Sequence, residues 1–554
     1  MRGYPTTSEH EDGRVGATGS RERTRSRTWW LVASLLIAAF LARAPLYLSV
    51  FPPFEGWDEY QHLAYIVHLD STGTIPVLDE RTRVPLALRP LMIAMPHSAS
   101  DREQVKEWGV LSYADYWTAP APSGAAARAF SSPRLYQAQH PPLAYALALP
   151  LWRALKKAHP LEAISALRTM NLLLVTAALV LFAGALERVV PSFAVRAAIL
   201  ALVCVHPLFF QNVARVANDG LAVATGIAGI SLLVLADGRT LLTRGLLAAS
   251  CIAASIWSKQ TGLTLIPALV LGLPLIGWLH RVPAARLWRV TSIVVVALFV
   301  FVAPLWLWSY QHYGSIVTTQ ESLGLAERGS PMNVLATSLS NLAWGPLVET
   351  LIVPGRPWIG GWSFLPMNAT LSRVHNWYWS MLLAAAGIGA IVAMLRRTRP
   401  IGRASSIVRS DAAVFGGLAV CAAVVIFTVL GLIDHAVVSN AVYGHATTNP
   451  WYSMTALPFL FVLLVCALEA IGTRFAATAA AALAVVFVAI DLHGTWIDMP
   501  RAYASTTDSA LQWSRLTAIH PAIFSGDFRW VFLATQLSAL VLVVGVLVYV
   551  SRHA

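Results

Sequence analysis

Apolar runs of about twenty residues recur along most of the chain, and they constrain its fold more than any other feature. A run of this length can cross the hydrocarbon core of a bilayer as a helix. Of the 554 residues, 56% are hydrophobic and only 12% are charged, whereas soluble domains carry roughly 25% charged residues. The sequence therefore predicts an all-α, polytopic membrane protein.

The positive charges lie between these runs rather than in one basic patch. The formal net charge is +12, but the arginines form short clusters in the connections between apolar segments. Such clusters are typical of the cytoplasmic loops of membrane proteins, so no nucleic-acid partner is expected. The four cysteines fall inside apolar runs without the spacing of a zinc site or a disulfide framework, which indicates small core residues.

Two apolar runs, 29–50 and 141–155, determine how many spans we expect and on which side of the membrane the loops lie. The run from Trp29 to Val50 is too long for the core of a signal peptide, so we interpret it as an uncleaved first span. The run 141–155 is short and contains Pro150, which favours a helix at the membrane surface. If it does not cross, the arginine clusters fall on one side, as the positive-inside rule requires, and both termini are cytoplasmic. About twelve spans are then expected, at residues 29–50, 165–186, 193–212, 218–236, 244–258, 261–280, 290–309, 377–395, 412–433, 451–470, 474–491 and 530–550.

This topology divides the chain into three parts. Residues 1–28 are polar and rich in arginine, and we expect a disordered cytoplasmic tail. Residues 29–280 form a transmembrane module with a first external loop at 51–164. Residues 281–554 form a C-terminal transmembrane region with an external loop at 310–376.

Acidic residues are concentrated directly after the first span, in the stretch Phe51-Pro-Pro-Phe-Glu-Gly-Trp-Asp-Glu-Tyr-Gln-His62. Carboxylates at the edge of a bilayer are costly unless they are paired or used. The topology brings further polar residues to the same face: Arg43, Gln139, His140, Asn218, Asp219, Ser258, Lys259 and Gln260. A lysine beside lipid suits a phosphate head group, and a carboxylate near it can take a proton from an attacking hydroxyl. Together these residues indicate group transfer from a lipid-phosphate donor.

The acidic residues also have structural interpretations. Asp58 or Glu59 could cap a surface helix or pair with Arg43, and Asp219 could cap the next span. The spacing of Glu59 and His62 allows two metal ligands on one helical face, but a single pair is weak support for a metal site.

The basic and aromatic residues have alternatives of the same kind. Lys259 could be an interfacial anchor whose ammonium reaches toward water. His62 and His140, taken singly, are more often hydrogen-bonded scaffold residues than ligands. Most of the 20 tryptophans are typical of the aromatic belt at a membrane interface.

A set of short elements follows in a fixed order over residues 29–280. They are Arg43 in the first span, Trp57-Asp58-Glu59 with His62, His140-Pro-Pro-Leu-x-Tyr145, Arg168 near the start of the second span, Ala214-Arg-x-x-Asn-Asp219-Gly-Leu, and Ser258-Lys259-Gln-Thr. In this order they resemble the GT-C superfamily of glycosyltransferases, which use polyprenyl-phosphate-linked sugars. Within it, the protein O-mannosyltransferases and the lipid A aminoarabinose transferase are the most similar. The resemblance implies a GT-C-like fold with about twelve transmembrane helices and periplasmic juxtamembrane helices.

The resemblance also implies roles for individual residues. Asp58 would be the general base that deprotonates the acceptor hydroxyl, which attacks and inverts the anomeric carbon. Glu59 and Asp219 would orient the substrates; if a divalent metal is used, Asp58 and Asp219 would hold it. Donor phosphate binding would involve Lys259, Arg43 and Gln260, and substrate binding would involve His62, His140 and Asn218.

The expected partners are a polyprenyl-phosphate-linked sugar, membrane lipids, and a glycan, lipid or protein acceptor, with the protein in the bacterial inner membrane. The sequence leaves the sugar, the acceptor and the lipid length open. A transporter or flippase of lipid-linked sugars is one alternative, although few charged residues lie within the spans. An O-antigen-ligase-like glycan transferase, using Arg356 and His312, is another, and a non-catalytic assembly subunit is a third.

Overall fold

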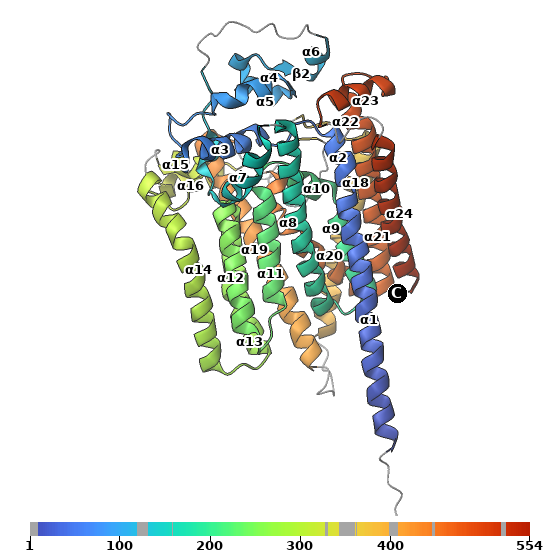
Figure 1. The fold of residues 1–554 in the computed structure, drawn as a ribbon. Helices are drawn as coiled ribbons and strands as arrows, with labels where there is room; N and C mark the ends of the chain where they lie inside the picture. Colours follow the sequence, from blue (N-terminus) through green and yellow to red (C-terminus); the bar gives the residue numbers. More distant parts are fainter. Residues whose placement is uncertain are drawn as a thin grey trace, which may run out of the picture.

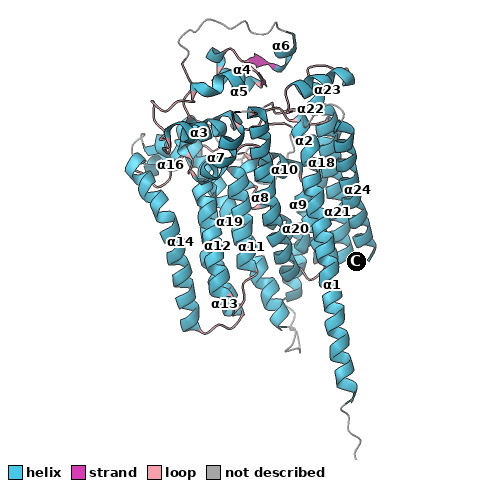
Figure 2. Ribbon diagram, viewed as in Figure 1, coloured by secondary structure: helices cyan, strands magenta, loops and turns pink. Residues whose placement is uncertain are grey.

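The computed structural model describes residues 9–118, 131–157, 159–326, 331–342, 360–361, 363–397, 408–445, 449–521 and 528–553. Helices dominate these residues (Figures 1 and 2). Strands β1 (Pro96–His97) and β2 (Leu111–Ser112) form one short parallel pair. The expectation of an all-α protein is thus confirmed apart from this pair.

Long helices run side by side and form a bundle (Figure 1). They are α1 (Glu9–Ala42), α8 (Pro160–Val189), α12 (Leu241–Ser258), α13 (Ile266–Leu279), α14 (Ala284–Tyr313), α18 (Ala369–Arg397), α19 (Val408–Tyr443), α21 (Thr473–His493) and α24 (Arg529–His553). Among the described residues, nine helical segments are long and apolar enough to cross a membrane. This is the pattern of a multi-pass membrane protein.

Shorter helices complete the bundle: α9 (Phe193–Val205), α10 (Pro207–Val213), α11 (Asp219–Val234) and α20 (Leu457–Glu469). Helices α9 and α10 are bent by 54° at their junction, and as one broken span they raise the number of crossing segments in the described part of the chain to ten. The bend arises because Pro207 keeps the preceding residue, His206, out of the helical region.

The expected spans and the observed helices can be compared directly. Each of the twelve expected spans coincides with a helix or with the α9–α10 pair. Two of those helices, α11 and α20, are shorter than a typical crossing helix, so a total of twelve spans stays a prediction. The first helix differs from expectation, because α1 begins at Glu9 within the segment 1–28 that we expected to be disordered. Its Arg and Glu residues are good helix formers, and they continue a helix that the first span has already nucleated.

One end of the bundle carries most of the short elements, and we call it the loop-rich end (Figure 1). Its helices are α2 (Ala44–Val50), α3 (Glu59–Thr72), α4 (Arg89–Ile93), α5 (Ala99–Gln104), α6 (Tyr113–Thr118), α7 (Leu143–Leu155), α15 (Gln320–Ala326), α16 (Pro331–Ser340), α22 (Met499–Tyr503) and α23 (Ser509–Ala518). Single turns are η1 (Leu86–Leu88), η2 (Lys106–Trp108), η3 (Tyr136–Gln139), η4 (Gln260–Leu265), η5 (Pro450–Ser453) and the π-helical η6 (Gly494–Asp498).

Helix α7 corresponds to the run 141–155, which we expected to stay out of the membrane. It lies against α3 at the loop-rich end and is not among the helices long enough to cross. The turn between α13 and α14, with Arg281, lies at the opposite end (Figure 1). The arrangement therefore agrees with the charge pattern that favoured a surface position for this run.

Candidate active site

Asp58, in the turn between α2 and α3, has a left-handed backbone with φ 57° and ψ 18°. An aspartate at a helix N-cap normally accepts a hydrogen bond from the first helical turn, but Asp58 makes no such bond. Its carboxylate accepts hydrogen bonds from the hydroxyl of Tyr136 and from Nε2 of Gln137, the latter at 3.0 Å. The residue is half-buried, and burial raises the pKa of its carboxyl above the ordinary value. A simple capping role is therefore wrong for Asp58.

Glu59, the next residue, is buried and fully bonded to the protein. Arg168 of α8 donates to its two oxygens at 2.8 and 2.6 Å, and the backbone N–H of Val216 donates at 2.8 Å. These bonds join the start of α3 to α8 and to the turn before α11. Glu59 thus works as a brace that holds Asp58 beside this turn, whereas the sequence suggested that it orients a substrate.

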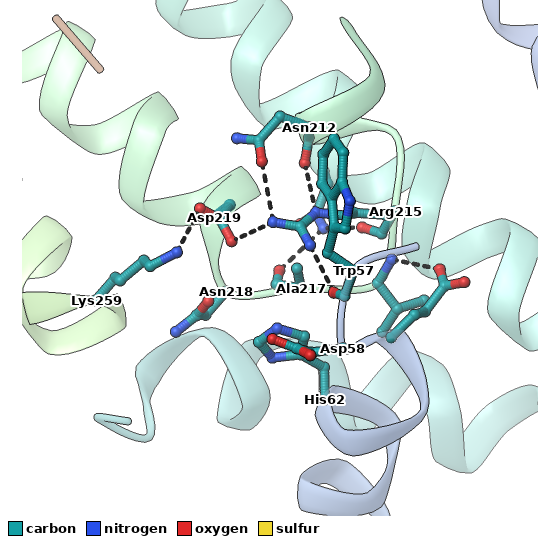
Figure 3. A network of polar contacts seen from close by, with 12 residues as sticks. Trp57, Asp58, His62, Asn212, Arg215, Ala217, Asn218, Asp219 and Lys259 are labelled. Atoms are coloured by element: carbon teal, nitrogen blue, oxygen red, sulfur yellow. Dashed lines mark hydrogen bonds and ion pairs between the residues drawn. The ribbon is translucent and has the colours of Figure 1, made fainter. Parts of the chain in front are cut away.

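Asp219, Arg215 and Lys259 form a buried charge network (Figure 3). Asp219 Oδ1 accepts from Lys259 Nζ at 2.7 Å, and Oδ2 accepts from Arg215 Nη2 at 2.8 Å. Arg215 also donates to the carbonyl of Trp57 at 2.5 Å. The network therefore contacts the residue immediately before Asp58. Both cations favour the ionised form of Asp58 and oppose the effect of burial on its pKa.

Two glycines permit this close approach. A Cβ at Gly56 would lie 2.9 Å from Cβ of Arg215, and a Cβ at Gly220 would lie 2.3 Å from the side chain of Asn171. Asn171 in turn donates to the carbonyls of Arg215 and Ala217 at 2.8 and 3.2 Å. A larger residue at Gly56 would push apart the segments that carry Asp58 and Asp219, and one at Gly220 would push Asn171 of α8 away from the start of α11.

Lys259, at the end of α12, has a setting that suits an anion. Its only recorded hydrogen bond among the described residues goes to Asp219, although an ammonium has three donors. The ring of Tyr452, on η5, lies 5.4 Å from Nζ, and the neighbouring Trp451 stacks on Trp57 with ring centroids 4.6 Å apart. The C-terminal transmembrane region thus contributes a wall to a site whose charged residues come from the first 280 residues.

Gln260 follows Lys259 in the sequence, but its side chain is occupied by hydrogen bonds within the protein. Its amide exchanges two hydrogen bonds with Thr318, through the side-chain hydroxyl and the backbone N–H. Thr318 also donates to the carbonyl of Gln139 at 2.8 Å. Gln260 therefore binds the predicted external loop 310–376, and Thr318 of this loop in turn binds η3.

His62 and His140 lie next to the charge network, and their imidazole rings stack with centroids 6.2 Å apart. His62 Nδ1 is 2.8 Å from the hydroxyl of Tyr145 on α7. Burial lowers the pKa of His62 well below its ordinary value and lowers that of His140 to about 3. Both rings are therefore neutral at physiological pH, and they can offer a substrate hydrogen bonds rather than positive charge.

Arg43 and Asn218, which we predicted to bind substrate, are both bonded to other parts of the protein. Arg43 forms an ion pair with Asp491 of α21 at 2.5 Å and also donates to the carbonyl of Cys204. The predicted alternative, a pair between Arg43 and Asp58 or Glu59, is therefore wrong. Asn218 donates to the carbonyl of Ser258 at 2.9 Å, while its buried Oδ1 has no partner among the residues that the structure describes. For the alternative glycan-transferase reading, His312 is exposed on α14, and Arg356 lies outside the described residues.

Glu55, three residues before Asp58, connects the site to the second external loop. Its carboxylate accepts hydrogen bonds from the backbone N–H of Ser363 at 2.6 Å and from the hydroxyl of Tyr113, also at 2.6 Å. Burial raises the pKa of Glu55 to about 7, and the hydrogen bonds only partly offset this effect. The contact fixes residues of both predicted external loops against the turn that carries Asp58.

Sequence reasoning gave no role to several residues that complete the site: Tyr136, Gln137, Arg215, Trp451 and Tyr452. Arg215 lies within the element that ends at Asp219 and could have been found as an i, i+4 ion pair at the start of a helix. The other four come from segments more than seventy residues away from Asp58, and nothing in their local sequence distinguishes them.

The carboxylates of this site do not fit a divalent metal. All four oxygens of Asp58 and Asp219 already accept a hydrogen bond, and two of the donors are the cations Arg215 and Lys259. A metal would reach only the remaining lone pairs of these oxygens, and the fixed positive charges of Arg215 and Lys259 would repel it. Among the residues that the structure describes, no group of three or more His, Cys, Asp or Glu side chains could hold a metal ion.

Comparison with known proteins gives one weak structural similarity. No protein-family model and no curated protein matches the chain. Among solved structures, the chain is similar to the oligosaccharyltransferase of Archaeoglobus fulgidus in its apo form, with 12% sequence identity and a TM-score of 0.38. The match covers 85% of this chain and 56% of the archaeal one, so the chain spans just over half the length of that protein.

Proposed function

We propose that this protein is a GT-C-type glycosyltransferase that moves a sugar from a polyprenyl-phosphate donor to an acceptor hydroxyl. The observation that carries the proposal is the half-buried carboxylate of Asp58 within the electrostatic field of Lys259 and Arg215. An accessible base beside a buried cation is what sugar transfer from a lipid phosphate requires. The loop-rich end would be the outer face of the bacterial inner membrane, with both termini in the cytoplasm.

The reaction is a single displacement. The acceptor oxygen attacks the anomeric carbon as its proton passes to Asp58, and the bond between that carbon and the phosphate oxygen breaks. The bonding electron pair leaves with polyprenyl phosphate, and the configuration at the anomeric carbon inverts. Lys259 would neutralise the charge that develops on the leaving phosphate, and Asp219 would hold the ammonium in place through its 2.7 Å hydrogen bond.

The remaining residues supply hydrogen bonds. His62 and His140 would act as neutral donors or acceptors, and the buried Oδ1 of Asn218 has no partner among the described residues. Arg215 stabilises the turn rather than the substrate, because its donors already go to Asp219, Asn212 and Trp57.

Replacement of Lys259 by methionine tests the donor site. We expect the affinity for a polyprenyl-phosphate sugar to fall about 10- to 100-fold and transfer to fall at least about 100-fold, because one preorganised cation is typically worth several kcal/mol at a developing charge. Donor binding is measured by titration of the purified protein in detergent. Lys157→Met, at an exposed position beside α7, is the matched control and should bind like the wild type. Unchanged donor affinity in Lys259→Met would argue against this phosphate site.

Removal of divalent metals should leave transfer intact. After treatment with EDTA and gel filtration, we expect the rate to stay within about twofold of the untreated protein, because Arg215 and Lys259 already supply the positive charge at the carboxylates. The rate is measured with and without added Mg²⁺ or Mn²⁺. Loss of transfer that either metal restores would show that the hydrogen-bonded arrangement of Asp58 and Asp219 opens to a metal in the working enzyme.

A further inference from the structure

Turn η3, within the predicted first external loop, binds both oxygens of the Asp58 carboxylate. Tyr136 and Gln137 are neighbours on η3, and each donates one hydrogen bond to a different oxygen of the Asp58 carboxylate. Such a two-point contact fixes the plane of the carboxylate as well as its position. It also explains why Asp58 makes no capping bond to α3, since its side chain is turned toward η3.

The backbone of Asp58 supports the same reading. A left-handed conformation is uncommon for residues other than glycine, although aspartate adopts it more readily than most. Phe54, four residues earlier, is also left-handed with φ 69°. The hydrogen bonds from Tyr136 and Gln137 hold the side chain of Asp58 in this turn.

Turn η3 is itself firmly anchored. The backbone N–H of Leu135 donates to the carbonyl of Thr82, and that of Val84 donates to the carbonyl of Pro133. Gln61 of α3 donates to the carbonyl of Arg134 at 3.1 Å. The segment is therefore fixed both to the first part of the same loop and to the helix that Asp58 precedes.

Resting on the function proposed above, we propose that Tyr136 and Gln137 are positioning residues that orient Asp58 to take the proton of the acceptor hydroxyl. One bond to each oxygen leaves a second lone-pair site on each, and the half-buried setting of Asp58 gives an acceptor access to one of them. The long first external loop thus has a catalytic purpose, because turn η3 within it sets the geometry of the base.

The phenol also favours the ionised form of the base. Burial raises the pKa of Tyr136 well above its ordinary value, so this group stays protonated and remains a donor. Its hydrogen bond lowers the pKa of Asp58, against the raising effect of burial. Without the phenol the ionised carboxylate loses a donor, so its pKa should rise and the base should be lost at a higher pH.

The test is the variant Tyr136→Phe, which removes one hydroxyl and keeps the ring. We expect kcat to fall about 10- to 100-fold, the KM for donor to stay within about twofold, and the acid limb of the pH–rate profile to move up by about one pH unit. Tyr116→Phe is the matched control, because Tyr116 lies in the same loop and its hydroxyl donates to the carbonyl of Ala94. It should retain the wild-type rate and profile.

Gln137→Leu is the second variant and removes the other donor, with the same expected direction. A readout that needs no acceptor is the infrared titration of the Asp58 carboxyl, identified by its disappearance in Asp58→Asn. In Tyr136→Phe this carboxyl should titrate at a higher pH than in the wild type.

The outcomes separate the two proposals. If Asp58→Asn is inactive while folded Tyr136→Phe and Gln137→Leu keep the wild-type kcat, pH profile and carboxyl titration, the positioning role is overturned and the general base stands. If Asp58→Asn itself retains full transfer, the proposed function of that residue fails, whatever the Tyr136 variant does. A raised carboxyl titration together with a reduced kcat in Tyr136→Phe supports the positioning role.

Discussion

Asp58→Asn is expected to bind a polyprenyl-phosphate sugar with nearly wild-type affinity and to transfer almost none of it. A positioned general base typically contributes 10²- to 10⁴-fold to a rate, and an amide cannot take up the proton of the acceptor. The substitution keeps the shape of the side chain, so its oxygen can still accept one of the bonds from Tyr136 and Gln137. Donor binding should survive because Lys259 and Asp219 are unchanged.

The measurement combines donor titration with a transfer assay on purified protein in detergent. Asp115→Asn is the control, since Asp115 is an exposed residue of the same external loop whose carboxylate bonds to Ser112. It should transfer sugar at the wild-type rate. Full transfer by Asp58→Asn would remove this residue from the mechanism.

Arg168→Met is expected to destabilise the protein more than any other single change discussed here. Arg168 is buried, and its guanidinium donates to both oxygens of Glu59 and to the carbonyls of Phe51 and Pro52. Removal of one partner of a buried pair leaves the other charge without compensation, which costs about 3–5 kcal/mol. The turn that carries Asp58 would lose its attachment to α8 at the same time.

Thermal unfolding in detergent measures this effect, and the midpoint should fall by several degrees. The control is Arg153→Met, because Arg153 pairs with Asp70 near the surface of α7 and such pairs contribute only about 0–1 kcal/mol. The double variant Glu59→Gln with Arg168→Met should recover part of the loss, since it leaves no buried charge unpaired. Equal unfolding midpoints for Arg168→Met and Arg153→Met would contradict the role of this pair as a brace.

The positions of the apolar helices could be predicted from the sequence, and so could the proximity of Asp58, Asp219 and Lys259. Hydropathy is a local property, so the apolar runs coincide with helices, and the surface position of α7 follows from its length and from the arginine clusters. Once the topology is known, Asp58, Asp219 and Lys259 must lie at the same end of the bundle. The structure adds the 2.7 Å contact between Lys259 and Asp219.

The partners of each charge could not be predicted, because they depend on tertiary packing. Glu59 and Asp58 are adjacent in sequence, yet one is bonded to Arg168 and the other to Tyr136 and Gln137. Arg43 lies between α1 and α2, but its partner, Asp491, is 448 residues away. Sequence pattern shows which residues reach a surface, while the choice among nearby partners is made by the helices that pack around them.

The most direct test of the central claim follows the donor itself. Purified protein in liposomes is given a polyprenyl-phosphate sugar, with and without an extract of envelope glycans and lipids as acceptor. The account predicts that polyprenyl phosphate is released only with acceptor present, in step with glycosylated product, and not with Asp58→Asn. Movement of intact donor across the liposome membrane without acceptor, and no release of polyprenyl phosphate under any condition, would contradict it and indicate a transporter.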